Sequence, residues 1–132
     1  MKRPMVSALY YLAALYDGIF GILLLTIPWR LYAAFEVTPP NHWAYVQFPA
    51  ALILIFALMF LAVARDPRAN RSLILYGMLL KTSYSGTVFG YWLMQGVPPM
   101  WKPFAVADLV FLVLFAWTYR DLAGAAGKQA HA

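Results

Sequence analysis

The chain of 132 residues contains no cysteine and very few charges, since acidic and basic side chains together make up only 11% of it. The missing cysteine excludes thiol nucleophiles, thiolate-bound clusters and disulfide-stapled secreted modules. Among the residues that are present, 64% are hydrophobic, against about 45–50% in a typical soluble domain. This composition excludes an ordinary soluble enzyme and a disordered chain. It indicates a small integral membrane protein.

Four stretches are apolar over about the 20 residues that a helix needs to cross a bilayer. They cover about residues 6–28, 45–64, 72–96 and 103–119, with proline-containing turns between them. Residues 29–37 are predicted to form a short interfacial helix after the first span. The sequence therefore predicts an all-α, antiparallel four-helix transmembrane bundle. We expect one domain over residues 1–122, followed by a flexible tail over residues 123–132.

The few basic residues fix the expected orientation. Seven of the ten lie before the first span, between the second and third, or after the fourth: Lys2, Arg3, Arg65, Arg68, Arg71, Arg120 and Lys128. Cytoplasmic loops carry an excess of Lys and Arg. We therefore expect a multi-pass protein with both termini in the cytoplasm. Its positive charge is explained by topology and lipid contact, so no nucleic-acid partner is expected.

Three charged residues fall inside the predicted spans, where each costs about 2.5–3.5 kcal/mol. At 1.5 Å per residue, Asp17, Lys81 and Asp108 lie about 16, 14 and 16 Å from the cytoplasmic ends of their spans. The three side chains are therefore predicted to share one layer, in which Lys81 bridges one or both carboxylates. Tyr84, on the same helical face as Lys81, is expected to offer its hydroxyl to this layer.

The charged layer has two interpretations, and the sequence leaves both open. It is either a structural ion-pair network that fixes the register of the helices, or a polar site for a ligand, a proton or a catalytic step. Two carboxylates against one ammonium leave one acid without a full countercharge, which is an ingredient of a functional site.

Glycines mark two faces for close helix approach. Gly18 and Gly21 lie beside Asp17 in the first span, where small residues let a neighbouring helix pack closely. Gly86 and Gly90 form a GxxxG motif in the third span, on a face different from that of Lys81. This second face is a candidate surface for a neighbouring span, a homodimer or a larger membrane complex.

A looser polar set lies at the outer side, formed by Asn41, His42 and Gln47. It either floors a small outward-facing cavity or caps the start of the second span. No spacing of His, Asp or Glu resembles a metal site, so no metal is expected.

The chain resembles small four-span bacterial inner-membrane proteins of unknown function, loosely described as DoxX-like. The resemblance covers roughly residues 6–122 and rests on Asp17-Gly18 with Gly21, Pro39-Pro40-Asn41-His42, Gln47-Phe48-Pro49, Asp66-Pro67 to Asn70-Arg71, Lys81, and Asp108-Leu109-Val110-Phe111. It implies an antiparallel four-helix bundle in the bacterial inner membrane. Some DoxX-like proteins are linked to quinone or respiratory redox partners, which makes a quinone the one cofactor to consider, although no cofactor ligand is visible in the sequence.

Three functions stay open. The favoured one is non-enzymatic: an accessory subunit, or a binder of a small lipophilic molecule through the Asp/Lys/Asp layer. The second is a proton-coupled oligomeric transporter. The third is an intramembrane enzyme that performs acid–base or quinone-linked chemistry.

Overall fold

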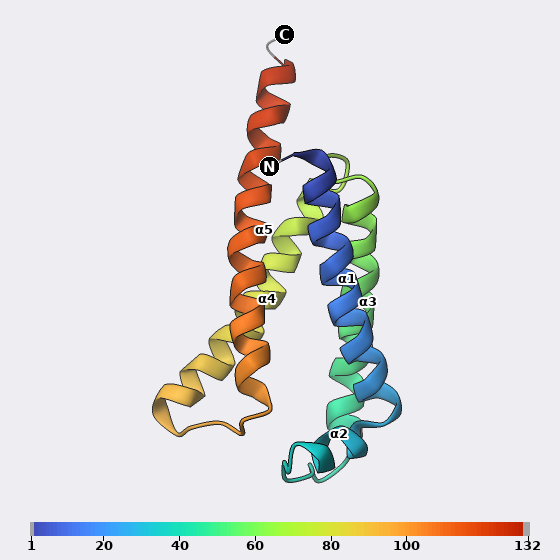
Figure 1. Cartoon of the computed structure of the whole chain (residues 1–132), viewed down its shortest axis with the longest axis vertical. Coiled ribbons are helices and arrows are strands. Elements are labelled where there is room, and N and C mark those ends of the chain that lie inside the picture. The colour runs from blue at the N-terminus through green and yellow to red at the C-terminus, as the bar shows by residue number, and fades with distance from the viewer. Residues whose placement is uncertain (1, 131–132) are drawn as a thin grey trace.

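The computed structural model describes residues 2–130, and side chains as far as Gly124 (Figure 1). Over residues 2–130 it contains helices, turns and short connections and no β-strand. The helices are α1 (Arg3–Thr26), α2 (Pro28–Ala34), α3 (Ala44–Arg65), α4 (Arg71–Met94) and α5 (Trp101–Ala130). The predicted all-α class is confirmed, and α2 occupies the place of the short helix expected after the first span.

The four long helices run up and down in chain order (Figure 1). α1 packs along α3, and α4 packs against α5, so that the molecule consists of two antiparallel pairs. The α3–α4 connection lies near the start of α1, at what is called here the terminal end. α2 and the α4–α5 connection lie at the opposite end, called the α2 end. The two pairs diverge toward the α2 end (Figure 1).

Prolines and one glycine determine where helices begin and end. Pro28 occupies the first turn of α2, where its fixed φ and missing N–H are favourable, and α1 therefore stops at Thr26. At the α3–α4 turn, the side-chain amide of Asn70 donates to the carbonyls of Ala62 and Asp66 at 3.0 and 3.1 Å. After α4, Gly96 adopts a φ of +82°, a conformation that favours glycine, and turns the chain toward α5.

An apolar cluster closes the bundle toward its terminal end. Tyr10, Phe60 and Phe115 are completely buried, and the rings of Tyr10 and Phe115 stack with centroids 4.8 Å apart. The hydroxyl of Thr118 donates to the Phe115 carbonyl, so the Tyr10 hydroxyl is the donor in its 2.6 Å bond to Thr118. This cluster joins α1, α3 and α5 across both pairs.

Three helices are long and apolar enough to cross a membrane: α1, α3 and the part of α5 from Trp101 to Gly124. α4 is as long as α1, at 24 residues, but polar side chains such as Lys81 and Ser85 make it less apolar. Apolar side chains also point outward, as on α1, where Leu12, Leu15 and Ile22 are each more than half exposed. Three helices thus have the length and apolar composition of a membrane span, and the prediction of four spans, with α4 as one of them, stays a prediction.

The last helix extends beyond the predicted end of the fourth span at about residue 119. α5 continues without a break from Trp101 to Ala130, through most of the segment expected to be a flexible tail. Nothing in residues 120–130 interrupts a helix, since alanine is a strong helix former and no proline follows Pro103. Residues 131 and 132 of that predicted tail lie outside the described residues.

Candidate functional site

Three charged side chains from three different helices meet in the interior. The ammonium of Lys81 on α4 donates to Oδ1 of Asp17 on α1 at 2.9 Å and to Oδ1 of Asp108 on α5 at 3.0 Å. The side chains of Asp17, Lys81 and Asp108 are 7, 1 and 9% exposed. The structure thus brings together the residues that the sequence places at one depth. We call these three residues the triad.

Aromatic rings surround the Lys81 ammonium on the sides that the carboxylates leave free. Its Nζ lies 5.4, 5.7 and 5.2 Å from the ring centroids of Tyr16, Phe60 and Phe111. These faces add a weak attraction for the cation and exclude water. Both charge-assisted hydrogen bonds are therefore strong, and the loss of either partner would leave an expensive buried charge.

Two polar atoms next to the triad have no hydrogen-bond partner among the described residues. They are Oδ2 of Asp17 and the hydroxyl of Tyr16, and both atoms are inaccessible to solvent. Buried polar groups are almost always paired, and an unpaired one costs about 1–3 kcal/mol. The sequence predicted Asp17 as a site residue, but Tyr16 was missed. Tyr16 directly precedes Asp17 in the first span, and this position could have indicated that it lies near the charged layer.

A cavity of about 780 Å³ reaches the triad from the space between the two helix pairs. Asp17, Lys81 and Asp108 are the only charged side chains among the described residues that line it, and most of the others are apolar or aromatic. Such a volume, with few polar groups in an apolar lining, is typical of a site for a small molecule.

The mouth of the cavity lies between α3 and α4. The exposed lining residues all come from these two helices: Tyr45, Pro49 and Leu52 on α3, and Ser83 and Thr87 on α4. On the opposite side, Phe20 of α1 and Phe104 of α5 close the seam with ring centroids 4.3 Å apart. The cavity therefore opens sideways, across the direction of the helices.

At the α2 end, aromatic side chains cover the cavity. Tyr32 of α2 packs against Trp43 and Trp101 with ring centroids 5.1 and 6.0 Å away. A phenol is neutral at physiological pH at its ordinary pKa of about 10. Burial raises the pKa of the Tyr32 phenol further, so this side chain stays neutral. The cover thus adds no charge to the cavity.

Tyr84 lines the cavity but does not bond to the triad. Its hydroxyl donates to the backbone carbonyl of Trp101 at 3.3 Å, which ties α4 to the start of α5. The expectation that this hydroxyl joins the charged layer is therefore not met. The physical reason is that Lys81 already satisfies one oxygen of each acid, while the first turn of α5 offers the Tyr84 hydroxyl a backbone carbonyl as acceptor.

The outer polar set makes structural contacts outside the cavity. Nδ1 of His42 accepts a hydrogen bond from the backbone N–H of Ala44 at 3.0 Å, at the start of α3. The side-chain amide of Gln47 donates to the Leu25 carbonyl at 3.0 Å, near the end of α1. Asn41 is exposed in the connection, and none of Asn41, His42 and Gln47 lines the cavity. These contacts favour the helix-capping interpretation over the cavity floor.

The four predicted packing glycines differ sharply in their surroundings. A Cβ on Gly21 would lie 2.7 Å from Cγ of Leu54, so this glycine permits the close approach of α1 and α3. A Cβ on Gly18 would make only an ordinary contact of 3.9 Å, with Ala57. A Cβ on Gly86 or Gly90 would meet nothing within 4 Å, so the GxxxG motif packs against no other helix within the described chain.

The sequence matches no protein-family model and no curated protein, and the fold matches no solved structure. The triad and its cavity must therefore be interpreted from their own geometry. Among the described residues, no group of three His, Cys, Asp or Glu side chains could hold a metal ion.

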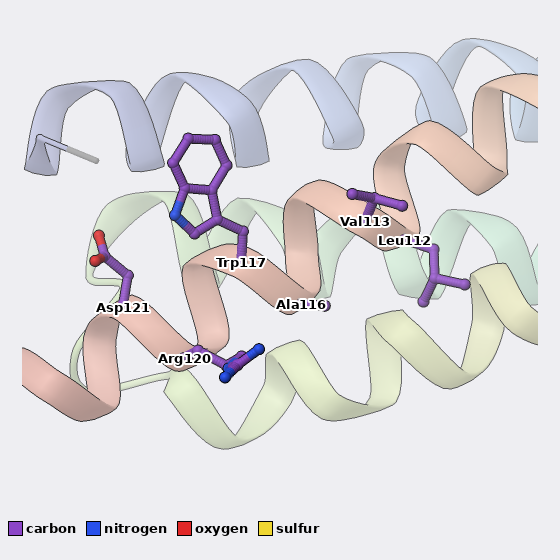
Figure 2. A pocket seen from close by; sticks show the side chains of 6 residues that line it. All are labelled: Leu112, Val113, Ala116, Trp117, Arg120 and Asp121. Atoms are coloured by element: carbon purple, nitrogen blue, oxygen red, sulfur yellow. The ribbon is translucent and has the colours of Figure 1, made fainter.

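A second, shallower groove of about 610 Å³ lies along the part of α5 nearer its C-terminus. Figure 2 shows the side chains that line it, with Trp117 and Asp121 directed to one side of the helix and Arg120 to the other. All its lining residues come from α5, so no second helix encloses it. The cavity at the triad is the better candidate site.

Proposed function

We propose that the chain is a four-span integral membrane protein, with α4 as the fourth span beside α1, α3 and α5. An apolar outer surface and a charged interior are the reverse of a soluble protein and suit a lipid environment. α4 is long enough to span, at about 36 Å for 24 residues, and Lys81 in its middle pairs with Asp17 of α1 and Asp108 of α5 instead of facing lipid. A location in the bacterial inner membrane rests on the DoxX-like resemblance.

The proposed orientation places the terminal end in the cytoplasm, following the basic residues there. Because the chain has no cysteine, single-cysteine variants report the topology without background. Asn41→Cys, at the α2 end, should react with a membrane-impermeant maleimide added to intact cells, whereas Ala69→Cys, in the α3–α4 connection, should react only after the cells are opened. The reverse pattern, or equal labelling of both, would contradict the orientation.

We further propose that the protein binds a small lipophilic molecule in the cavity between the helix pairs. One observation carries this proposal: a largely apolar cavity of about 780 Å³ ends at a charged triad and opens sideways between α3 and α4. In a bilayer that opening faces lipid, so an apolar molecule enters without crossing water. The apolar lining holds its body, and the triad meets its polar end. A quinone is one molecule of this type.

The apolar cluster of Tyr10, Phe60 and Phe115 lies between the triad and the terminal end. No observation therefore favours a continuous polar path across the molecule, as a proton-coupled transporter would need. The geometry supports binding, with the protein acting alone or as an accessory subunit of a larger complex.

The test is to purify the protein in a mild detergent and identify co-purifying lipophilic molecules by mass spectrometry. Leu52→Trp places a large ring at the mouth, where Leu52 is exposed and lines the cavity. The matched control is Leu58→Trp, the same change at an exposed position of α3 outside the lining. We expect a bound molecule in the wild type and in Leu58→Trp, and its loss from Leu52→Trp. If the wild type carries nothing, or if both variants retain the molecule, the proposal is wrong.

Association of two copies through α4 stays an alternative proposal to a mouth open to lipid, because Ser83 and Thr87 lie on the same face of α4 as the GxxxG glycines. It is supported by the open faces of Gly86 and Gly90, which could accept the backbone of a second helix. Gly86→Cys should then form a disulfide-linked dimer in membranes under mild oxidation, while Leu12→Cys, on the exposed face of α1, should not. A monomer in both cases would refute association through this face.

A further inference from the structure

The inner end of the cavity holds two acidic side chains and one basic side chain, and this ratio bears on which ligand the cavity selects. The inference rests on the proposed binding of a lipophilic molecule. Two carboxylates share one ammonium, and no other charged side chain of the described residues lines the cavity. With both acids ionised, the triad carries a formal charge of −1.

The single positive charge is not available to a ligand. The Lys81 side chain is only 1% exposed, and its ammonium already donates to both carboxylates. Aromatic rings cover its remaining sides. A carboxylate or phosphate entering the cavity would therefore meet two acids of its own sign before it could reach Lys81.

An acceptor, in contrast, is left unused. Oδ2 of Asp17 has no hydrogen-bond partner among the described residues, and only 5% of the surface of Asp17 is exposed. Asp17 lines the cavity, and so does Tyr16, whose hydroxyl is likewise unpaired among the described residues. A group that donates hydrogen bonds and carries a positive charge would complete both the hydrogen bonding and the charge balance of this end of the cavity.

We propose that the cavity selects amphiphiles whose polar head is a protonated amine. When such a head binds, the side chains that shield Oδ2 of Asp17 move aside, and the ammonium donates to this oxygen and neutralises the formal charge of the triad. Aromatic faces near the triad, including Tyr16 and Phe104, suit a cation as well. The apolar tail lies along the lining between α3 and α4 and leaves through the mouth toward lipid. A neutral hydroxyl head would satisfy the hydrogen bond but not the charge, and an anionic head would satisfy neither.

The experiment compares three radiolabelled probes with the same alkyl chain: dodecylamine, dodecanol and dodecanoate. Binding is measured on immobilised phosphatidylcholine nanodiscs that contain the full chain, with empty nanodiscs subtracted. At about pH 8 the amine is protonated and the carboxylate is ionised. We expect the amine to bind at least about tenfold more tightly than the alcohol, a difference of about 1.4 kcal/mol. The carboxylate should bind more weakly than the alcohol.

Asp17→Asn tests the source of the preference, because it removes one negative charge and leaves Lys81 paired with Asp108. The ratio of amine to alcohol affinity should fall from about tenfold to near one. Asp108→Asn provides a second variant with the same change in charge. The matched control is Glu36→Gln, which removes a negative charge at an exposed residue outside the lining and should leave the ratio unchanged.

The outcomes separate the two proposals. If alcohol and amine bind equally, or the carboxylate binds as well as the alcohol, the selectivity is wrong while the binding of lipophiles stands. If Asp17→Asn and Asp108→Asn both keep the preference, the triad is not its source and the inference fails. If none of the three probes binds above the empty nanodiscs, the proposed binding function fails as well.

Discussion

Replacing Lys81 by methionine removes the only positive charge of the triad while it keeps a long, apolar side chain. Asp17 and Asp108 would then face each other across the interior with no countercharge. Their side chains are 7 and 9% exposed, so water cannot replace the lost ammonium without opening the bundle. We expect Lys81→Met to be the most destabilising single substitution in the triad.

The magnitude follows from the two short bonds at 2.9 and 3.0 Å that Lys81 makes. Breaking a buried ion pair by removing one partner costs about 3–5 kcal/mol, because a buried charge is left uncompensated. Asp17→Asn leaves the pair of Lys81 with Asp108 intact, so its cost should be smaller, about 1–3 kcal/mol. The triple variant Asp17→Asn, Lys81→Met and Asp108→Asn leaves no charge in the layer and should be within about 1 kcal/mol of the wild type.

The assay is reversible unfolding in mixed micelles with increasing dodecyl sulfate, followed by far-ultraviolet circular dichroism. Lys102→Met serves as the matched control, since the ammonium of Lys102 lies 4.8 Å from the centroid of the Trp92 ring, and its loss should cost about 1 kcal/mol or less. A Lys81→Met variant as stable as Lys102→Met would refute the argument that the triad is a tightly coupled, water-excluded network. A triple variant less stable than Lys81→Met alone would refute it too.

Two further predictions concern the packing around the triad. Gly21→Ala places a Cβ 2.7 Å from Cγ of Leu54 and should lower the free energy of unfolding by about 1–3 kcal/mol. The Cβ of Gly86→Ala meets nothing within 4 Å, so this variant should raise the free energy of unfolding by up to about 1 kcal/mol. Equal effects of the two variants in the same assay would contradict the packing described for α1 and α3. Tyr10→Phe removes the donor of the 2.6 Å bond to Thr118 and should cost about 1 kcal/mol in thermal unfolding. An unchanged midpoint would show that this bond contributes nothing to closure of the terminal end.

The depth of each charged residue could be predicted from the sequence because a helix rises by a fixed distance per residue. Asp17, Lys81 and Asp108 lie at matching distances from the basic ends of their helices, and the structure brings them together. The GxxxG motif predicted a contact that the described chain does not make, since close packing depends on which face a neighbour occupies. The contact actually made at Gly77, where a Cβ would lie 2.6 Å from the Phe60 ring, has no motif around it.

The cavity could not be predicted, because it depends on how far the two helix pairs diverge. Helical spacing in the third span gave no indication that Ser83 and Thr87 would line one cavity with Leu52 of α3. The partnership of Tyr84 with the Trp101 carbonyl depends equally on the tilt of α4 against α5. Such tilts result from the whole set of interhelical contacts, which no local pattern in one helix contains.

The most direct measurement is the accessibility of a spin label at Ser83→Cys, at the mouth of the cavity, in a chain that has no other cysteine. Collisions with oxygen report lipid, and collisions with a water-soluble nickel complex report water. We expect high oxygen accessibility and low nickel accessibility at this label, with the oxygen accessibility falling when dodecylamine is added. A label at Ser83 that is accessible to the nickel complex, or that does not respond to the amphiphile, would contradict a ligand cavity open to the bilayer.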